Sequence, residues 1–254
     1  MESRITYTPS IRLFVSDPLT DGTALQLSRP QSHYLINVMR CTTGQQLLLF
    51  NGKDGEWLAE ISVADKKACV VSLQHQSRQQ TVDPDVWLIF APLKKDRTDF
   101  LIEKATELGV SRLIPAITNR TQSGRLNVER LQATAMESAE QSRRLSVPEI
   151  VEPASFAEII SNWPENRRLV YLDETGHGQP LAGVLAGGTE HLAFWIGPEG
   201  GFSADELDAL DKLTFSVAAD LGPRILRAET AATAALAIRQ SVADIQPTTL
   251  DRRP

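Results

Sequence analysis

The stretch Phe194-Trp195-Ile196-Gly197-Pro198-Glu199-Gly200-Gly201-Phe202-Ser203 decides the fold of this 254-residue chain. The apolar residues 192–196 predict a buried strand, and Ser203 with the acidic residues after it predicts the first turn of a helix. In open α/β sheets, ligands bind where strands end in such loops. The adjacent glycines would let a ligand approach the backbone without obstruction by a Cβ atom. Read alone, the loop is equally compatible with a tight turn that binds nothing.

A second glycine-proline loop follows a later short strand and has the sequence Leu221-Gly222-Pro223-Arg224-Ile225-Leu226-Arg227-Ala228-Glu229-Thr230-Ala231. Its apolar side chains alternate with Arg224 and Arg227, and it leads into an alanine-rich helix. Neither loop matches the dinucleotide fingerprint or the P-loop. Two such loops in corresponding positions predict two walls of one pocket. Both charged residues also have purely structural interpretations. Glu229 could simply be an acid that stabilises the N-terminus of the helix, and Arg227 could be a solvated charge or an ion-pair partner of Glu229.

The rest of the chain divides into an all-β part and an α/β part. Short apolar runs separated by turn signals predict a small barrel over residues 1–76, including a hairpin at Asn51-Gly52, with one helix at 33–39. The polar residues 77–84 predict a linker. From residue 85 on, strands and helices alternate, which predicts the fold class α/β with a mostly parallel sheet and a terminal tail at 247–254. The expected strands are 86–93, 110–117, 168–173, 192–196 and 215–218, and the expected helices, besides the one after Ser203, are 97–108, 127–141 and 229–242.

Charge, cysteine spacing and hydropathy bear on whether this chain binds nucleic acid, holds a metal or enters a membrane. The net charge of −6 argues mildly against nucleic acid, but the acidic excess lies in residues 151–254, so a local basic surface for RNA remains open elsewhere. Cys41 and Cys69 have no metal-binding spacing, and we expect no metal and two reduced thiols. Since there is no signal sequence and no apolar run long enough to span a bilayer, we expect a cytoplasmic protein with no membrane partner.

With these motifs the chain resembles the 16S ribosomal RNA uridine N3-methyltransferase family, which belongs to the trefoil-knotted, SPOUT-class S-adenosylmethionine-dependent methyltransferases. The resemblance rests on the two loops, on Leu172 at a strand end, and on residues 12–15, 33–40, 103–110 and 137–148. It implies a PUA-like β-barrel RNA-binding domain (1–76), a linker (77–84) and an α/β-knot methyltransferase domain (85–246) in a homodimer. The deep trefoil knot follows from the resemblance alone, because knots are nearly absent among folds.

The resemblance also assigns the site. S-adenosylmethionine is expected to bind between the loops, at Leu172, Ile196, Gly197, Pro198, Glu199, Gly200, Gly201, Leu221, Gly222, Ile225 and Leu226. Arg227 is expected to stabilise the uracil anion, while Glu229 or Glu199 orients it or accepts the N3 proton. The implied partner is 16S ribosomal RNA of the small subunit, and its expected contacts are Arg12, Arg40, Arg120, Gln141, Arg143 and Arg144.

Two other functions remain open. One is a knotted methyltransferase that acts on another nucleotide, such as a transfer RNA ribose, and the other is a non-catalytic PUA-like RNA-binding protein. The intact loops and the run 227–230 favour catalysis, and the N-terminal barrel with residues 141–144 favours the ribosomal uridine. Residues 141–144 are alternatively a helix C-terminus whose cations only complement its dipole.

Overall fold

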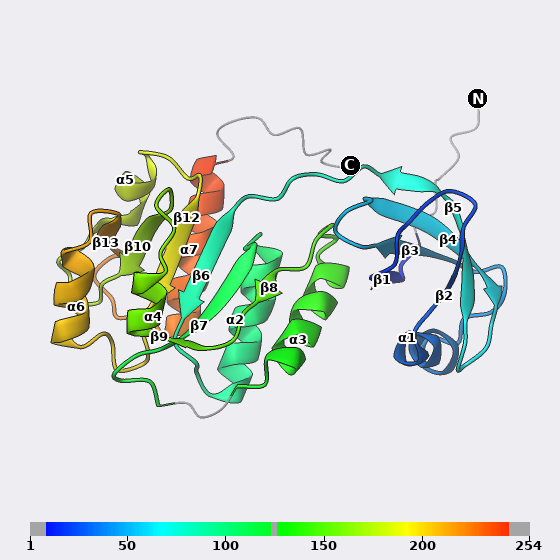
Figure 1. Cartoon of the computed structure of the whole chain (residues 1–254), viewed down its shortest axis with the longest axis horizontal. Helices are drawn as coiled ribbons and strands as arrows, with labels where there is room; N and C mark the ends of the chain where they lie inside the picture. Colours follow the sequence, from blue (N-terminus) through cyan, green and yellow to red (C-terminus); the bar gives the residue numbers. More distant parts are fainter. Residues whose placement is uncertain (1–8, 123–125, 244–254) are drawn as a thin grey trace. The chain divides into compact units, whose positions relative to one another are not determined.

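The structure is a computed structural model that describes residues 9–122 and 126–243, and its contacts divide the chain into two compact units (Figure 1). The first unit holds the described residues up to Val82 together with Ala139–Val147, and the second unit holds the rest. The segment Ala139–Val147 therefore packs with the N-terminal residues, although it lies in the middle of the α/β part of the sequence.

The first unit is built on a five-stranded sheet with the order β1-β3-β4-β5-β2. Its strands are β1 (Arg12–Phe14), β2 (Ala24–Gln26), β3 (Gln46–Phe50), β4 (Glu56–Val63) and β5 (Val70–Arg78). The predicted hairpin joins β3 to β4, where the Asn51 side chain accepts hydrogen bonds from the backbone N–H groups of Lys53 and Asp54. Among the described residues no pairing joins β1 to β2, so the predicted barrel is an open half-barrel. The last strand, β5, reaches into the predicted linker.

The helix of the first unit begins earlier than predicted. It starts as α1 (Arg29–His33) and continues as the π-helical turn η1 (Tyr34–Val38). The reason is a capping box, in which the side chains and backbone N–H groups of Ser28 and Gln31 bond reciprocally. The helix ends before Arg40, because the φ of 56° at Arg40 is in the left-handed region and cannot continue the helix.

The second unit is built on a parallel sheet with the order β11-β13-β10-β12-β6-β7-β8, and β9 also pairs with β7. The strands are β6 (Val86–Phe90), β7 (Arg112–Ile117), β8 (Glu149–Ile150), β9 (Ala154–Ser155), β10 (Arg168–Leu172), β11 (Gln179–Pro180), β12 (Leu192–Ile196) and β13 (Ser216–Asp220). All five residues of β12 are buried, as expected for a strand covered on both faces. The predicted mostly parallel α/β sheet is confirmed, whereas the knot stays a prediction.

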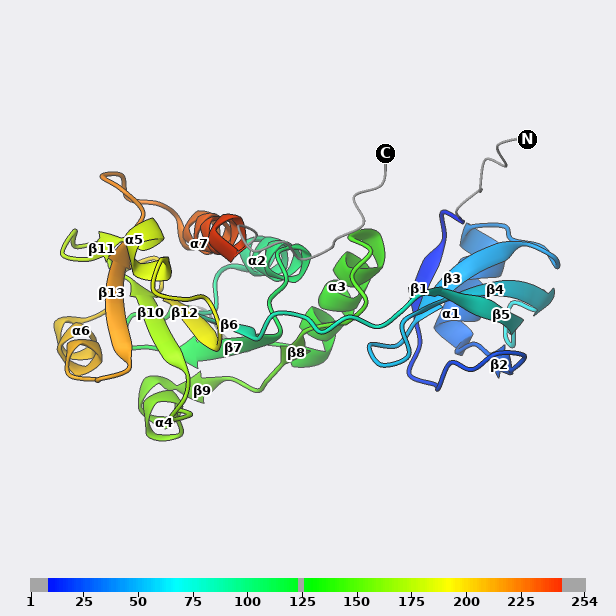
Figure 2. The ribbon, with the colours of Figure 1, turned by 90° about the horizontal axis from the view of Figure 1, so that it is seen from above.

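Helices cover both faces of this sheet. They are α2 (Lys95–Glu107), α3 (Val128–Gln141), α4 (Phe156–Ser161), α5 (Leu181–Leu185), α6 (Ala204–Asp211) and α7 (Ala228–Ala243). Figure 2 shows α2, α5 and α7 over one face and α4 and α6 over the other. The short helices α4 and α5 were not predicted. No helix in the described ranges combines the length and apolar character needed to cross a bilayer.

Arg12 explains why Ala139–Val147 belongs to the first unit. Its Nε lies 2.7 Å from Glu56 Oε2, and its Nη atoms donate to the carbonyls of Ala139 at 2.8 Å and Arg144 at 2.5 Å. The side chains of Arg12 and Glu56 are 5% and 4% exposed. Arg12 therefore fastens the end of α3 to β1 and β4, which favours a structural role over the predicted contact with RNA.

Candidate functional site

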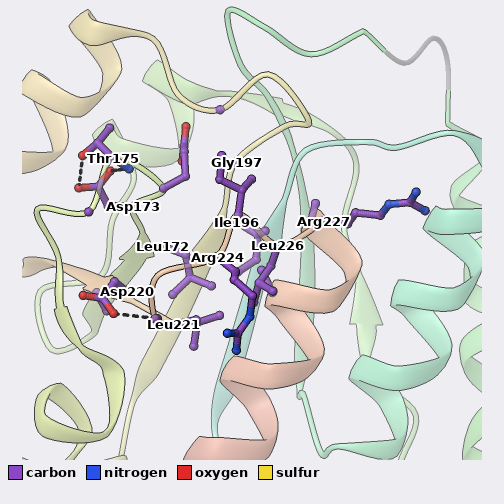
Figure 3. A pocket seen from close by; sticks show the side chains of 18 of the residues that line it. Leu172, Asp173, Thr175, Ile196, Gly197, Asp220, Leu221, Arg224, Leu226 and Arg227 are labelled. Carbon is purple, nitrogen blue, oxygen red and sulfur yellow. Dashed lines mark hydrogen bonds between the residues drawn. The ribbon is translucent and has the colours of Figure 1, made fainter.

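A cavity of about 770 Å³ lies in the second unit, at the carboxyl ends of β10, β12 and β13 (Figure 3). These three strands are adjacent and parallel, so the loops that follow them meet at one edge of the sheet. The volume is in the range of small-molecule sites, about 300–1,000 Å³. Of the predicted cofactor residues, all but Gly200 line it, namely Leu172, Ile196, Gly197, Pro198, Glu199, Gly201, Leu221, Gly222, Ile225 and Leu226.

The loop after β12 requires its glycines for steric reasons. Gly201 has a φ of 69°, and a Cβ atom there would lie 1.6 Å from Glu174 Oε1. A Cβ atom on Gly197 would lie 3.1 Å from the ring of Phe202. The Phe202 ring in turn packs edge-on against Tyr171 and Trp195, with centroids 6.2 and 6.1 Å away. The loop is therefore pressed onto the core from one side and onto the loop after β10 from the other.

Hydrogen bonds fix the outer side of the same loop. The predicted N-cap Ser203 forms a capping box with Glu206, and the buried Glu206 carboxylate also accepts the backbone N–H of Asn119 at 2.8 Å. Arg120 Nη1 donates to the Gly200 carbonyl at 2.7 Å. Arg120, predicted to contact RNA, thus braces the cavity wall from the segment that follows β7.

The loop after β10 adds polar groups that the sequence analysis did not single out. Asp173 accepts hydrogen bonds from the Thr175 backbone N–H at 2.9 Å and from its hydroxyl at 2.7 Å (Figure 3). On the opposite side, Asp220 Oδ1 accepts the Gly222 N–H at 2.9 Å. The sequence signal that could have identified these carboxylates is their position at strand ends, since Asp173 ends one predicted strand and Asp220 closely follows another. These carboxylates give the apolar cavity acceptors for ligand hydroxyl groups.

Arg97 connects the two predicted catalytic carboxylates. Its Nη1 lies 2.5 Å from Glu199 Oε1, and its Nε lies 3.7 Å from Glu229 Oε1. The Glu229 side chain is 11% exposed, and its Oε2 atom is buried without a hydrogen-bond partner among the described residues. Arg97 and Glu199 line the cavity, whereas Glu229, at the start of α7, is not among the lining residues. Sequence reasoning missed Arg97 as a site residue, since nothing local links α2 to the loop after β12.

Arg224 and Arg227 both line the cavity and leave the loop in different directions (Figure 3). Both side chains are exposed, and neither forms an ion pair within the described ranges. The Arg227 carbonyl accepts the Ala231 N–H at 2.8 Å, so its backbone is fixed by the first turn of α7. The site therefore offers two cations not yet neutralised by protein carboxylates.

None of the predicted RNA contacts is among the residues that line the cavity, and all of them except Arg120 belong to the first unit. Arg40, Gln141 and Arg143 are exposed on the first unit, and Arg144 Nε donates to Ser146 Oγ at 3.1 Å. Contact of these residues with RNA stays a prediction. No cluster of His, Cys, Asp and Glu suited to a metal ion occurs among the residues that the structure describes.

Comparison with known proteins agrees with this architecture. Residues 81–240 match the model of a family described as an RNA methyltransferase domain, and residues 27–74 match that of an RNA methyltransferase PUA domain. Fold and site thus define a two-domain RNA methyltransferase.

The relatives narrow the class further. Ribosomal RNA small subunit methyltransferase E of Rickettsia conorii is 32% identical over 231 residues, which cover 89% of this chain and 93% of that protein. A structure of the protein of that name from Neisseria gonorrhoeae, bound to S-adenosylmethionine, superposes with a TM-score of 0.83 at 26% identity, covering 93% of this chain and 98% of that one. A methyltransferase from Legionella pneumophila, also bound to S-adenosylmethionine, gives 0.83 at 28% identity over the same shares. This chain belongs to the ribosomal RNA small subunit methyltransferase E family.

Proposed function

We propose that this chain transfers a methyl group from S-adenosylmethionine to N3 of a uridine in 16S ribosomal RNA, as a cytoplasmic homodimer. The observation that carries the proposal is the single cavity formed by the loops after β10, β12 and β13. It is supported by the family and by the cofactor bound in two similar structures.

The cavity fits the cofactor chemically. Leu172, Leu221 and Leu226 would hold the adenine in an apolar slot, and Asp173 or Asp220 would accept hydrogen bonds from the ribose. The bare backbone at Gly197 and Gly201 lets the ligand approach the loop closely. When bound, the cofactor supplies a methyl group already activated by its sulfonium charge, so a metal ion is not needed.

The chain's own residues must then position uracil and control its N3 proton. Because Arg97 is paired with Glu199, Arg224 and Arg227 are the cavity arginines available to stabilise charge on the uracil oxygens, and we assign this role to Arg227, as the family resemblance indicates. Glu199 lines the cavity and is better placed than Glu229 to accept the proton. Since pairing occupies the N3 edge of uracil, the target base must be unpaired or flipped out.

Arg227→Ala tests this assignment. S-adenosylmethionine affinity by calorimetry should stay within about threefold, whereas single-turnover methyl transfer should fall by about 10² or more, as for loss of one transition-state donor. Arg224→Ala, on the same loop, is the matched control and should retain most activity. Near-normal turnover of Arg227→Ala would sink the role given to Arg227.

The product identifies the acceptor. Nucleosides from small ribosomal subunits incubated with the protein and the cofactor should contain 3-methyluridine by mass spectrometry. Only 2′-O-methylated nucleosides, or modified transfer RNA, would support the alternative knotted methyltransferase. Cofactor binding with no product on either RNA would support a non-catalytic RNA-binding protein.

The homodimer is supported by an exposed apolar side chain on α2, the helix that packs against α7. Ala231, Ala232 and Ala235 are buried within the unit, but Phe100 on α2 is 43% exposed. A large apolar side chain there is suited to a two-fold interface. Sedimentation at micromolar concentration should show a dimer that Phe100→Asp weakens, and a monomer for the unaltered chain would contradict it.

A further inference from the structure

A second, smaller hollow of about 230 Å³ lies on the first unit, remote in sequence from the catalytic loops. It is lined by Arg29, His33, Asn37, Lys66 and Lys67. Arg29, His33 and Asn37 follow one another at intervals of four residues along α1 and η1, so they lie on one side of the helix. Lys66 and Lys67 come from the turn between β4 and β5.

The hollow is positively charged on a chain whose net charge is −6. Arg29, Lys66 and Lys67 supply three full positive charges, and all three side chains are exposed. The nearby carboxylate, Asp65, accepts the backbone N–H groups of Lys67 and Ala68 at 2.7 and 3.1 Å, and these bonds hold its pKa below the ordinary value. The Asp65 carboxylate thus bonds to the backbone of the turn, and the positive charges of the arginine and the two lysines outnumber its one negative charge.

The two sides of the hollow are fixed to each other. The buried hydroxyl of Ser32 in α1 accepts the Cys69 backbone N–H at 3.0 Å and donates to the Ser28 carbonyl at 2.9 Å. The Leu27 N–H also donates to the Cys69 carbonyl at 2.9 Å. Because the helix and the lysine turn share these bonds, the cations are held around the hollow before any ligand arrives, which lowers the entropic cost of binding.

An exposed aromatic ring lies on the neighbouring face of the same helix. Tyr34 is 38% exposed, and Val38, one turn later, is 59% exposed. Large apolar side chains beside a cationic hollow suit a ligand that carries both phosphates and flat rings. Unpaired RNA has this chemistry, since its bases stack on aromatic side chains while its backbone contacts cations. The hollow also falls within residues 27–74, which match the RNA methyltransferase PUA domain.

We propose that this hollow binds a backbone phosphate of unpaired RNA, with a base stacked on Tyr34. The inference rests on the proposed function, in which the substrate is ribosomal RNA. It assigns the substrate's second point of attachment to α1, η1 and the β4–β5 turn of the first unit.

The test compares Lys66→Ala/Lys67→Ala with the matched control Lys53→Ala/Lys212→Ala, which removes two other exposed lysines. Anisotropy of a fluorescein-labelled transcript of small-subunit RNA is measured over a range of KCl concentrations. The hollow variant should bind about tenfold more weakly. The slope of log K against log[salt] should fall by about 0.7 for each RNA phosphate that the variant no longer neutralises. Calorimetric affinity for S-adenosylmethionine should not change in either variant.

Tyr34 is tested by Tyr34→Phe and Tyr34→Leu, of which only the first keeps a ring for stacking. Phe should bind RNA like Tyr, whereas Leu should weaken binding with an unchanged salt slope. The inference is overturned if both double variants bind the RNA equally well, or if micromolar inorganic phosphate displaces the RNA. An unaltered chain that methylates RNA while the hollow variants behave as controls would refute only this inference. Failure of the unaltered chain to bind RNA would refute the proposed function as well.

Discussion

Arg97→Met should separate the positioning of the catalytic carboxylates from the binding of the cofactor. In the structure, Arg97 bridges Glu199 at 2.5 Å and Glu229 at 3.7 Å. A charge-assisted hydrogen bond of this kind contributes about 1.5–3 kcal/mol when shielded from water. The Arg97 and Glu199 side chains are 33% and 32% exposed, so solvent screening reduces the contribution to about 1 kcal/mol. For a domain of this size, we expect a decrease in melting temperature of about 2–4 °C.

The effect on catalysis should be larger than the effect on stability. Without the bridge, Glu199 is free to turn from the cavity, and a displacement of about 1 Å can cost about 10² in rate. We expect kcat to fall by about ten- to a hundredfold, with little change in KM for RNA. Arg97→Lys, which keeps one charge, should recover part of the lost kcat.

The matched control is Lys104→Met, which removes a cation from the same helix that pairs only with Glu107 of α2 among the described residues. Its kcat should equal that of the unaltered chain. The reasoning is refuted if Arg97→Met keeps the original kcat, whatever its melting temperature. A loss of stability with unchanged kinetics would mean that Arg97 only supports the fold.

Three further substitutions have defined outcomes. Gly201→Ala combines a φ of 69° with a Cβ atom 1.6 Å from a glutamate oxygen of the neighbouring loop, so calorimetry should show at least tenfold weaker cofactor binding. The control is Gly109→Ala, which has a φ of 82° but open space around the Cβ atom. Its backbone strain should only lower the melting temperature. Burial would raise the pKa of Asp85, but hydrogen bonds, foremost from Arg167, hold it below its ordinary value. The Asp85 carboxylate therefore stabilises the fold above about pH 4, and the difference in urea midpoint between the unaltered chain and Asp85→Asn should vanish as the pH falls below that value; a constant difference from pH 7 to pH 3 would contradict this. Arg12→Met should lower the free energy of unfolding by about 3 kcal/mol because the buried Glu56 carboxylate loses its nearest cation and keeps, among the described residues, only Arg78 at 3.7 Å, and a change below about 1 kcal/mol in urea would argue against the importance of the Arg12–Glu56 pair.

The elements that the sequence predicted are those with strong local signals. Continuous apolar runs identified β10 and β12, the second of which ends in Gly197-Pro198, and the cap at Ser203 identified α6. The short helix α4 was missed, although Ser155 and Glu158 form a capping box that the sequence contains. Its six residues are too few for a clear periodic pattern. The length of an element therefore determined, more than its composition, whether the sequence could predict it.

Side-chain environment could not be predicted in the same way. Arg12 was expected to contact RNA because it is a basic residue of a PUA-like barrel, and nothing local in the sequence shows that it is buried, since its partners Glu56 and Ala139 lie 44 and 127 positions away. Arg97 was overlooked for the same reason, since Glu199 is 102 positions away. Contacts over such separations depend on strand order, which the local pattern does not encode.

The two glycine-proline loops look alike in sequence, yet their surroundings require different roles. Glycine at 201 is favoured by its φ of 69°, and the loop is braced by Arg120 and packed on the core, so it cannot move without breaking several contacts. A Cβ atom on Gly222 would meet nothing within 4 Å, and Ile225 on the same loop is 87% exposed. An exposed isoleucine at the rim of a cavity costs solvation free energy until something covers it. Under the proposed function, the loop after β12 would therefore set the geometry of the cofactor, and the loop after β13, which carries Arg227, is the wall left open for the ligands to cover.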